Sequence, residues 1–231
     1  MKLNQGSFLK MVLNREFYNL IRSENGLIKM ELKKNDVLFK EGDVSSGIYC
    51  IETGNIKIIK NESKVNKRII HLASKGEILG LHAILNNHAY TNTAVVMDKS
   101  TTSFLSAGKF FNLLESDNSY KLLVMKALCT RIDTMEHRIN VICEKQTEQR
   151  FADILLLLIK KYGLKQKQIL RIKLSLDDLA NYTCTSRSYM KKIIIDFSQK
   201  GIISYHSGEI NIFDKKQLET IALTENNMTN A

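Results

Sequence analysis

The 231-residue chain contains no proline and no tryptophan. Without proline, glycine has to mark the turns and the ends of helices. No apolar run approaches the roughly 18 residues needed to cross a bilayer, since the longest covers only residues 154–159. We therefore expect no membrane partner. The first ten residues also lack the continuous apolar core of a signal peptide, so we expect a cytoplasmic protein.

Clustered cysteines are also missing. Cys50, Cys129, Cys143 and Cys184 are scattered, with no pair at CxxC spacing and no histidine at a zinc-ligand interval. We interpret them as reduced thiols, which is the usual state in a cytoplasmic chain. A redox role or a metal site is the alternative.

Positive charge is abundant but does not point to one region. The formal net charge is +10, which suits a polyanionic partner. Lysine and arginine exceed the acidic residues in both the first and the last part of the chain. The charge therefore favours a nucleic-acid partner without locating the site.

The first 110 residues alternate short segments rich in isoleucine and valine with glycines. Short strands with glycine turns at near-regular spacing predict an all-β roll or barrel. The predicted strands cover residues 36–40, 48–52, 55–60, 68–73, 93–97 and 101–105. Helical spacing of apolar residues over 8–27 predicts an N-terminal helix. We assign residues 1–117 to this domain.

A heptad pattern follows, in a segment without glycine. The apolar positions are 3, 4, 3, 4 and 3 residues apart: Met125, Leu128, Ile132, Met135, Ile139 and Ile142. So narrow a seam between charged residues favours a helix that pairs with a second copy of itself, related by two-fold symmetry. The alternative is a helix packed on its own β domain. We assign residues 118–145 to a dimerisation helix.

Residues 146–231 predict a winged helix-turn-helix. Ser175 can cap a helix over 176–182, residues 183–185 form a break, and Ser186 can cap a second helix that ends at Gly201. This spacing is typical of a helix-turn-helix. Two short strands around Gly208 then predict a wing. Double-stranded DNA is therefore the expected partner.

The second helix begins with hydroxyl and basic side chains. Arg187 can donate two hydrogen bonds to a guanine, while hydroxyls and lysines suit phosphates. The alternative is an ordinary basic surface helix. The predicted DNA-binding residues are Thr185, Ser186, Arg187, Ser188, Tyr189, Lys191 and Lys192.

Two motifs carry a resemblance to a known family. The first is LFKEGD at 38–43, followed by GIYCI at 47–51 and GNIKI at 54–58; the second is LDDLANYTCTSRSYMKKII at 176–194. With this order of domains, the chain resembles the Crp/Fnr family of bacterial transcription regulators over residues 25–222. The resemblance implies an α+β fold, with a jelly-roll-like β-roll sensor, a long dimerisation helix and a winged helix-turn-helix. It also implies a non-enzymatic homodimer that binds a pseudo-palindromic operator and contacts RNA polymerase.

The region that binds cyclic AMP in this family departs from the family pattern. Gly80 is kept, but Leu81 stands where a glutamate would accept from the ribose hydroxyl. No arginine lies between Arg68 and Arg131 to pair with a cyclic phosphate. We therefore predict a small-molecule effector other than cyclic AMP. Its expected pocket comprises Gly80, Leu81, His82, Ala83, Asn92 and Thr93.

The cysteines and histidines of the roll bear on other ligands. An iron–sulfur cluster of the Fnr type would need closely spaced N-terminal cysteines, and the first here is Cys50. His71, His82 and His88 leave haem open. A cupin-like metal enzyme would need two histidines one residue apart, whereas His82 and His88 are six apart. A roll that binds no ligand, in a regulator always competent for DNA, is the main alternative.

Two positions of the helix-turn-helix also differ from the family pattern. Ser188 replaces a frequent glutamate, so the usual half-site is not expected. Cys184 occupies a turn position that is often glycine. We expect the turn to form with Cys184 either under mild strain or at a negative φ.

Overall fold

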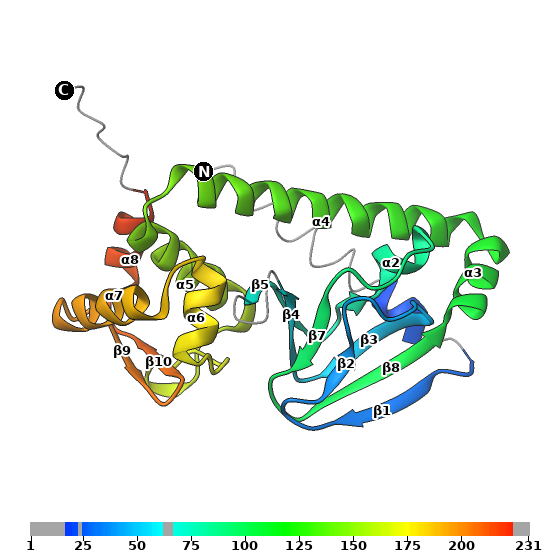
Figure 1. Cartoon of the computed structure of the whole chain (residues 1–231), viewed down its shortest axis with the longest axis horizontal. Coiled ribbons are helices and arrows are strands. Elements are labelled where there is room, and N and C mark those ends of the chain that lie inside the picture. Colours follow the sequence, from blue (N-terminus) through cyan, green and yellow to red (C-terminus); the bar gives the residue numbers. More distant parts are fainter. Residues whose placement is uncertain (1–16, 23–24, 62–66, 224–231) are drawn as a thin grey trace. The chain divides into compact units, whose positions relative to one another are not determined.

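The computed structural model describes residues 17–22, 25–61 and 67–223. The chain divides into two compact units, residues 1–135 and 136–231, and the boundary falls within one long helix, α4 (Asn118–Glu144) (Figure 1). We describe each unit by itself. The finer division at residues 117 and 145 stays a prediction.

The first unit is built around two four-stranded antiparallel sheets. One has the strand order β1-β8-β3-β6 and the other β2-β7-β4-β5. Apolar side chains from both, including Leu38, Tyr49, Ile51 and Ile56, form one buried cluster. The strands are β1 (Ile28–Leu32), β2 (Val37–Phe39), β3 (Gly47–Thr53), β4 (Asn55–Asn61), β5 (Lys67–Ser74), β6 (Ile78–Leu79), β7 (Thr93–Val96) and β8 (Ser100–Ser106).

A second buried cluster lies between the roll and its helices. Residues 17–22 are helical, and Phe17, Tyr18 and Ile21 are buried with side chains of α2 (Leu81–Leu85) and α3 (Ala107–Ser116). The Tyr18 hydroxyl donates to Glu52 Oε2 at 3.0 Å. These residues lie within the predicted N-terminal helix; residues 8–16 and 23–24 of that prediction lie outside the described residues.

Helix α4 is 27 residues long, which corresponds to about 40 Å at 1.5 Å per residue. Val124 is buried and Leu128 half-buried against the roll. By contrast, Met125 is 62%, Ile132 53% and Ile139 57% exposed. Met135 and Ile142 are exposed as well. In the single chain, most of the predicted seam therefore faces solvent.

The second unit packs its helices and a two-stranded sheet around Phe151, Leu179, Met190 and Phe197, all buried. The rings of Phe151 and Phe197 lie 5.5 Å apart between centroids. Its elements are α5 (Thr147–Tyr162), a 3₁₀ turn (Gln166–Gln168), α6 (Leu176–Thr183), α7 (Arg187–Gln199), β9 (Ile203–His206), β10 (Glu209–Ile212) and α8 (Lys215–Leu223). Across the described part of the chain, no helix combines the length and apolar character that a membrane span requires.

The predicted caps set the limits of the helix-turn-helix. Ser175 Oγ accepts from Asp178 N at 3.1 Å, and Asp178 Oδ2 accepts from Ser175 N at 3.2 Å. Ser186 Oγ accepts from Tyr189 N at 3.2 Å. These reciprocal bonds satisfy amide groups that a helix start otherwise leaves without a partner. The two helices and the β9–β10 hairpin follow the sequence expectation closely.

Of the two conformations expected for Cys184, the structure has the strained one, with a positive φ. Its φ of 58° and ψ of 53° place it in the left-handed region, where a β-carbon is costly and glycine is not. Its amide donates to the Ala180 carbonyl and so closes α6. The turn therefore forms at the expense of local backbone strain.

Replacing Cys184 with glycine should raise the free energy of unfolding by up to about 1 kcal/mol. The relief of backbone strain should outweigh the extra conformational entropy that glycine loses on folding. Chemical denaturation measures the change. Cys184→Ala is the control, since it removes the thiol and keeps the β-carbon. A Cys184→Gly protein less stable than the parent would contradict the strain.

Candidate functional site

The N-terminal turns of α7 present one polar face. Arg187, Ser188, Lys191 and Lys192 are exposed, whereas Met190, Ile193, Ile194 and Phe197 form the buried face. Ser186 and Tyr189 are exposed too, and Thr185 is half-buried in the turn. All seven predicted DNA-binding residues thus lie in the turn or at the start of this helix.

Two of these side chains contact carboxylates that the sequence did not indicate. Arg187 Nη1 lies 3.4 Å from both carboxylate oxygens of Asp177, in the first turn of α6. The Tyr189 hydroxyl donates to Glu148 Oε1 at 2.7 Å, and this bond raises the pKa of Tyr189. Such pairs join residues from different helices, so sequence spacing alone does not reveal them.

An apolar surface hollow adjoins the basic face. It is bounded by α7, the start of α6 and the wing, and Ile195 is exposed there beside Lys191. Its lining residues are Leu176, Arg187, Ser188, Lys191, Ile194, Ile195 and Tyr205. Apolar side chains of this kind can pack on a thymine methyl group in the major groove of DNA.

Two arginines fix the carboxyl end of α6. Arg138, on α4, donates through Nη2 to the Tyr182 carbonyl at 3.1 Å, and its guanidinium carbon lies 4.3 Å from the centre of the Tyr182 ring. Arg150, on α5, donates to the Thr183 carbonyl at 3.2 Å. These bonds satisfy carbonyls that the helix end leaves without a helical partner. They also join α4 and α5 to the helix that precedes the recognition helix.

Residues of the β-roll and of α4 line a partly open cavity of about 220 Å³. Gly80, Leu81, His82, Ala83 and Asn92 line it, as the sequence predicted for an effector pocket. Thr93 does not line it: this residue is buried in β7, and its hydroxyl oxygen accepts from Glu41 N at 3.0 Å. The cavity is smaller than the roughly 300–1,000 Å³ of pockets for drug-sized ligands.

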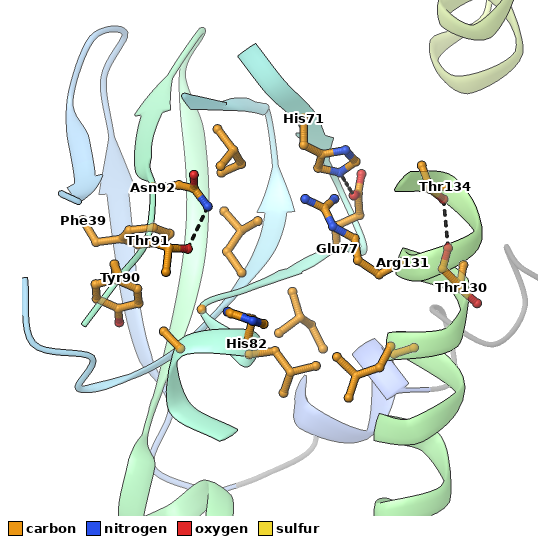
Figure 2. A pocket seen from close by; sticks show the side chains of 18 of the residues that line it. Phe39, His71, Glu77, His82, Tyr90, Thr91, Asn92, Thr130, Arg131 and Thr134 are labelled. Atoms are coloured by element: carbon orange, nitrogen blue, oxygen red, sulfur yellow. Dashed lines mark hydrogen bonds and ion pairs between the residues drawn. The ribbon is translucent and has the colours of Figure 1, made fainter. Parts of the chain in front are cut away.

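Helix α4 closes one side of the cavity. Ala127, Leu128, Thr130, Arg131 and Thr134 all line it. Figure 2 shows Arg131 pointing from α4 toward Glu77 and His71. From the sequence, Arg131 is a charged residue beside the heptad seam and the end of a stretch without arginine. Its place in the cavity could not be predicted, because a helix far along the chain gives no local sign of facing the roll.

The polar groups of the cavity carry charges of both signs. His71 Nε2 lies 2.5 Å from Glu77 Oε2, and Glu77 Oε1 accepts from Ser74 N at 2.9 Å. Arg131 supplies a positive group nearby. Asn92 donates to the Thr91 hydroxyl at 3.0 Å. In the described ranges, no three histidine, cysteine, aspartate or glutamate side chains gather as metal ligands.

Gly80 has to be glycine for two reasons. Its φ of 87° lies in the left-handed region. A β-carbon there would also lie 2.8 Å from the Gly47 carbonyl oxygen, on β3. The start of α2, which lines the cavity, therefore lies close against β3.

Family models match both parts of the chain. The family model for the cyclic nucleotide-binding domain matches residues 29–117, and that for the Crp-like helix-turn-helix domain matches residues 149–221. The chain is 24% identical to the anaerobic regulatory protein of Bacillus subtilis, over 93% of this chain and 91% of the relative.

Solved structures share the fold. FixK2 from Bradyrhizobium japonicum superposes with a TM-score of 0.76 at 14% identity, covering 86% of this chain and 98% of that protein. The c-di-GMP-responsive global regulator CLP of Xanthomonas campestris gives a TM-score of 0.72 at 14% identity, covering 91% and 100%. The expected α+β fold, with a β-rich domain, a long helix and a helix-turn-helix, is confirmed.

Replacing Gly80 with alanine should lower the free energy of unfolding by about 1–3 kcal/mol, through backbone strain and the contact with Gly47. Gly76→Ala is a matched control, because Gly76 has a φ of 88° but open space around its would-be β-carbon. Thermal or chemical unfolding measures both. Equal losses in the two variants would contradict the steric argument.

Proposed function

This chain belongs to the Crp/Fnr family of transcription regulators, and from that premise we propose that it binds a pseudo-palindromic operator as a homodimer. The helix-turn-helix makes it a DNA-binding protein. Members of the family are regulators and not enzymes, so the cupin-like enzyme is set aside.

The observation that carries the proposal is the exposed basic start of α7. Arg187, Lys191 and Lys192 lie on its solvent face, which follows a capped turn typical of a recognition helix. Arg187 has the fork of donors that guanine O6 and N7 accept. The two lysines suit phosphates on either side of the groove.

The exposed seam of α4 supports the homodimer. Met125, Ile132, Met135 and Ile139 form a row of exposed apolar side chains, and a second copy of the helix would remove them from water at about 25 cal/mol per Å². Leu128 is shared between this seam and the roll. Two-fold pairing would present two recognition helices to successive major grooves, about 34 Å apart.

The roll cavity supports a small-molecule effector other than cyclic AMP. Leu81 offers no acceptor to a ribose hydroxyl, and the Glu77 carboxylate would repel the phosphate that Arg131 attracts. A ligand in this cavity would contact α4, the helix that we propose pairs with its copy in the second chain. A family neighbour of the same fold is described as responsive to c-di-GMP, so fold alone does not dictate cyclic AMP. RNA polymerase as a partner and a cytoplasmic location stay predictions.

Selection of bound duplexes from a random DNA pool, at stated salt and without effector, tests the function. The proposal predicts enrichment of a two-fold symmetric site. A protein that is folded and dimeric but enriches nothing, even with cell extract added, would contradict it.

On the selected site, Arg187→Ala should cost roughly 1–3 kcal/mol of binding free energy and relax the base preference at one position of each half-site. Lys192→Ala is the comparison: it should weaken binding to all sequences and lower the salt slope by about one. Equal loss on all sequences for Arg187→Ala would show that Arg187 contacts phosphate only.

Ile139→Lys should abolish dimerisation, because it places a charge in the apolar seam. Since Ile139 is exposed in the single chain, the variant should keep its fold. Sedimentation should report the 26.4 kDa of one chain for this variant and twice that mass for the parent. Asn140→Lys, at the neighbouring exposed position off the seam, should stay dimeric. A dimeric Ile139→Lys protein would place the interface elsewhere.

A thermal-shift series with nucleotides, thiols and haem tests the effector. A ligand present at 100 times its Kd adds about 2.7 kcal/mol to the unfolding free energy, so binding is detectable. We expect cyclic AMP to leave the melting temperature unchanged. Saturable stabilisation by cyclic AMP would contradict our interpretation of Leu81 and Glu77, and stabilisation by any compound would exclude a roll without ligand.

A further inference from the structure

We propose that Asp177 is a positioning residue for base recognition: it orients Arg187 toward guanine and weakens binding to DNA that lacks the operator. This inference rests on the proposed function, in which Arg187 contacts a base. It adds a residue from α6 to the specificity determinants of α7.

The geometry places Asp177 beside the first residue of the recognition helix. Both of its oxygens lie 3.4 Å from Arg187 Nη1. Neighbouring Asp178, not Asp177, forms the capping box with Ser175. The hydrogen bonds that cap α6 therefore do not use the carboxylate of Asp177, and the short turn between α6 and α7 keeps this carboxylate next to Arg187.

The pairing leaves the useful edge of the guanidinium for DNA. An arginine carries five N–H donors in a planar fork. Because Nη1 takes both carboxylate contacts, Nε and Nη2 remain on the opposite edge to donate two parallel hydrogen bonds to guanine O6 and N7. Asp177 thus reduces the rotational freedom of a long side chain that has to meet one base edge.

The negative charge of Asp177 should weaken binding to DNA that lacks the operator. Binding without sequence preference depends on phosphate contacts and counterion release. An arginine paired with a carboxylate contributes less to such contacts, and the carboxylate itself repels phosphates. The pair is exposed, with Asp177 57% and Arg187 68% accessible, so its contribution to stability is small. Its effect should therefore appear in DNA selectivity.

The test compares Asp177→Asn with the parent on the selected operator and on a scrambled duplex of equal length. We expect operator affinity to fall and scrambled affinity to hold or rise, lowering their ratio about tenfold. Asp196→Asn is the matched control: it removes the same charge from α7, where Asp196 pairs with Lys200 at 2.7 Å. That variant should leave the ratio unchanged.

A double-mutant cycle assigns the effect to Arg187. In an Arg187→Lys background, which lacks the fork of donors, Asp177→Asn should no longer change the ratio. An unchanged ratio in Asp177→Asn alone, or an equal change in both backgrounds, would overturn the inference while leaving the proposed function intact. A parent protein that enriches no operator would overturn the proposed function, and this inference with it.

Discussion

The apolar stripe along α4 constrains the rest of the molecule. A single chain covers only part of it, through Val124 and Leu128 against the roll. Met125, Ile132 and Ile139 stay in water, although removing such side chains from water is the main favourable term in association. A second copy of the helix can cover these side chains, because its own apolar residues have the same heptad spacing.

The same helix carries three kinds of contact on different faces. Thr130, Arg131 and Thr134 line the roll cavity, the seam lies on another face, and Arg138 holds the carboxyl end of α6. In our account, a ligand in the cavity biases how two copies of α4 pair. Arg138 and Arg150, which donate to the carboxyl end of α6, would then carry that change to the helix-turn-helix.

The parts of the structure that depend on local signals could be predicted from the sequence. Ser175 and Ser186 mark the starts of α6 and α7, and short segments rich in isoleucine and valine between glycines mark most of the roll strands. β1 was missed because its residues are mostly exposed, and β6 because it has two residues. α2 and α3 were missed as well. α2 has only five residues and is too short to show a helical period. The buried residues of α3, Phe110, Leu113 and Leu114, do have helical spacing, so this helix could have been predicted from the sequence.

The contacts that join distant segments could not be predicted in this way. Arg131 at the cavity, Asp177 beside Arg187 and Arg138 at Tyr182 each bring together residues from separate elements. Residue type and spacing predicted most of the cavity lining and the exposed polar start of α7, but not which charged side chains lie beside them. The exclusion of Thr93 from the cavity lining has the same origin, since β7 turns that side chain toward Glu41.

The most direct test of the account is the stoichiometry of the protein–DNA complex, measured by sedimentation on the selected operator and on one isolated half-site. We expect two chains on the full operator. Binding to the half-site should be much weaker, because only one of the two recognition helices can then contact its bases. One chain per full operator, bound as tightly as on the half-site, would contradict it.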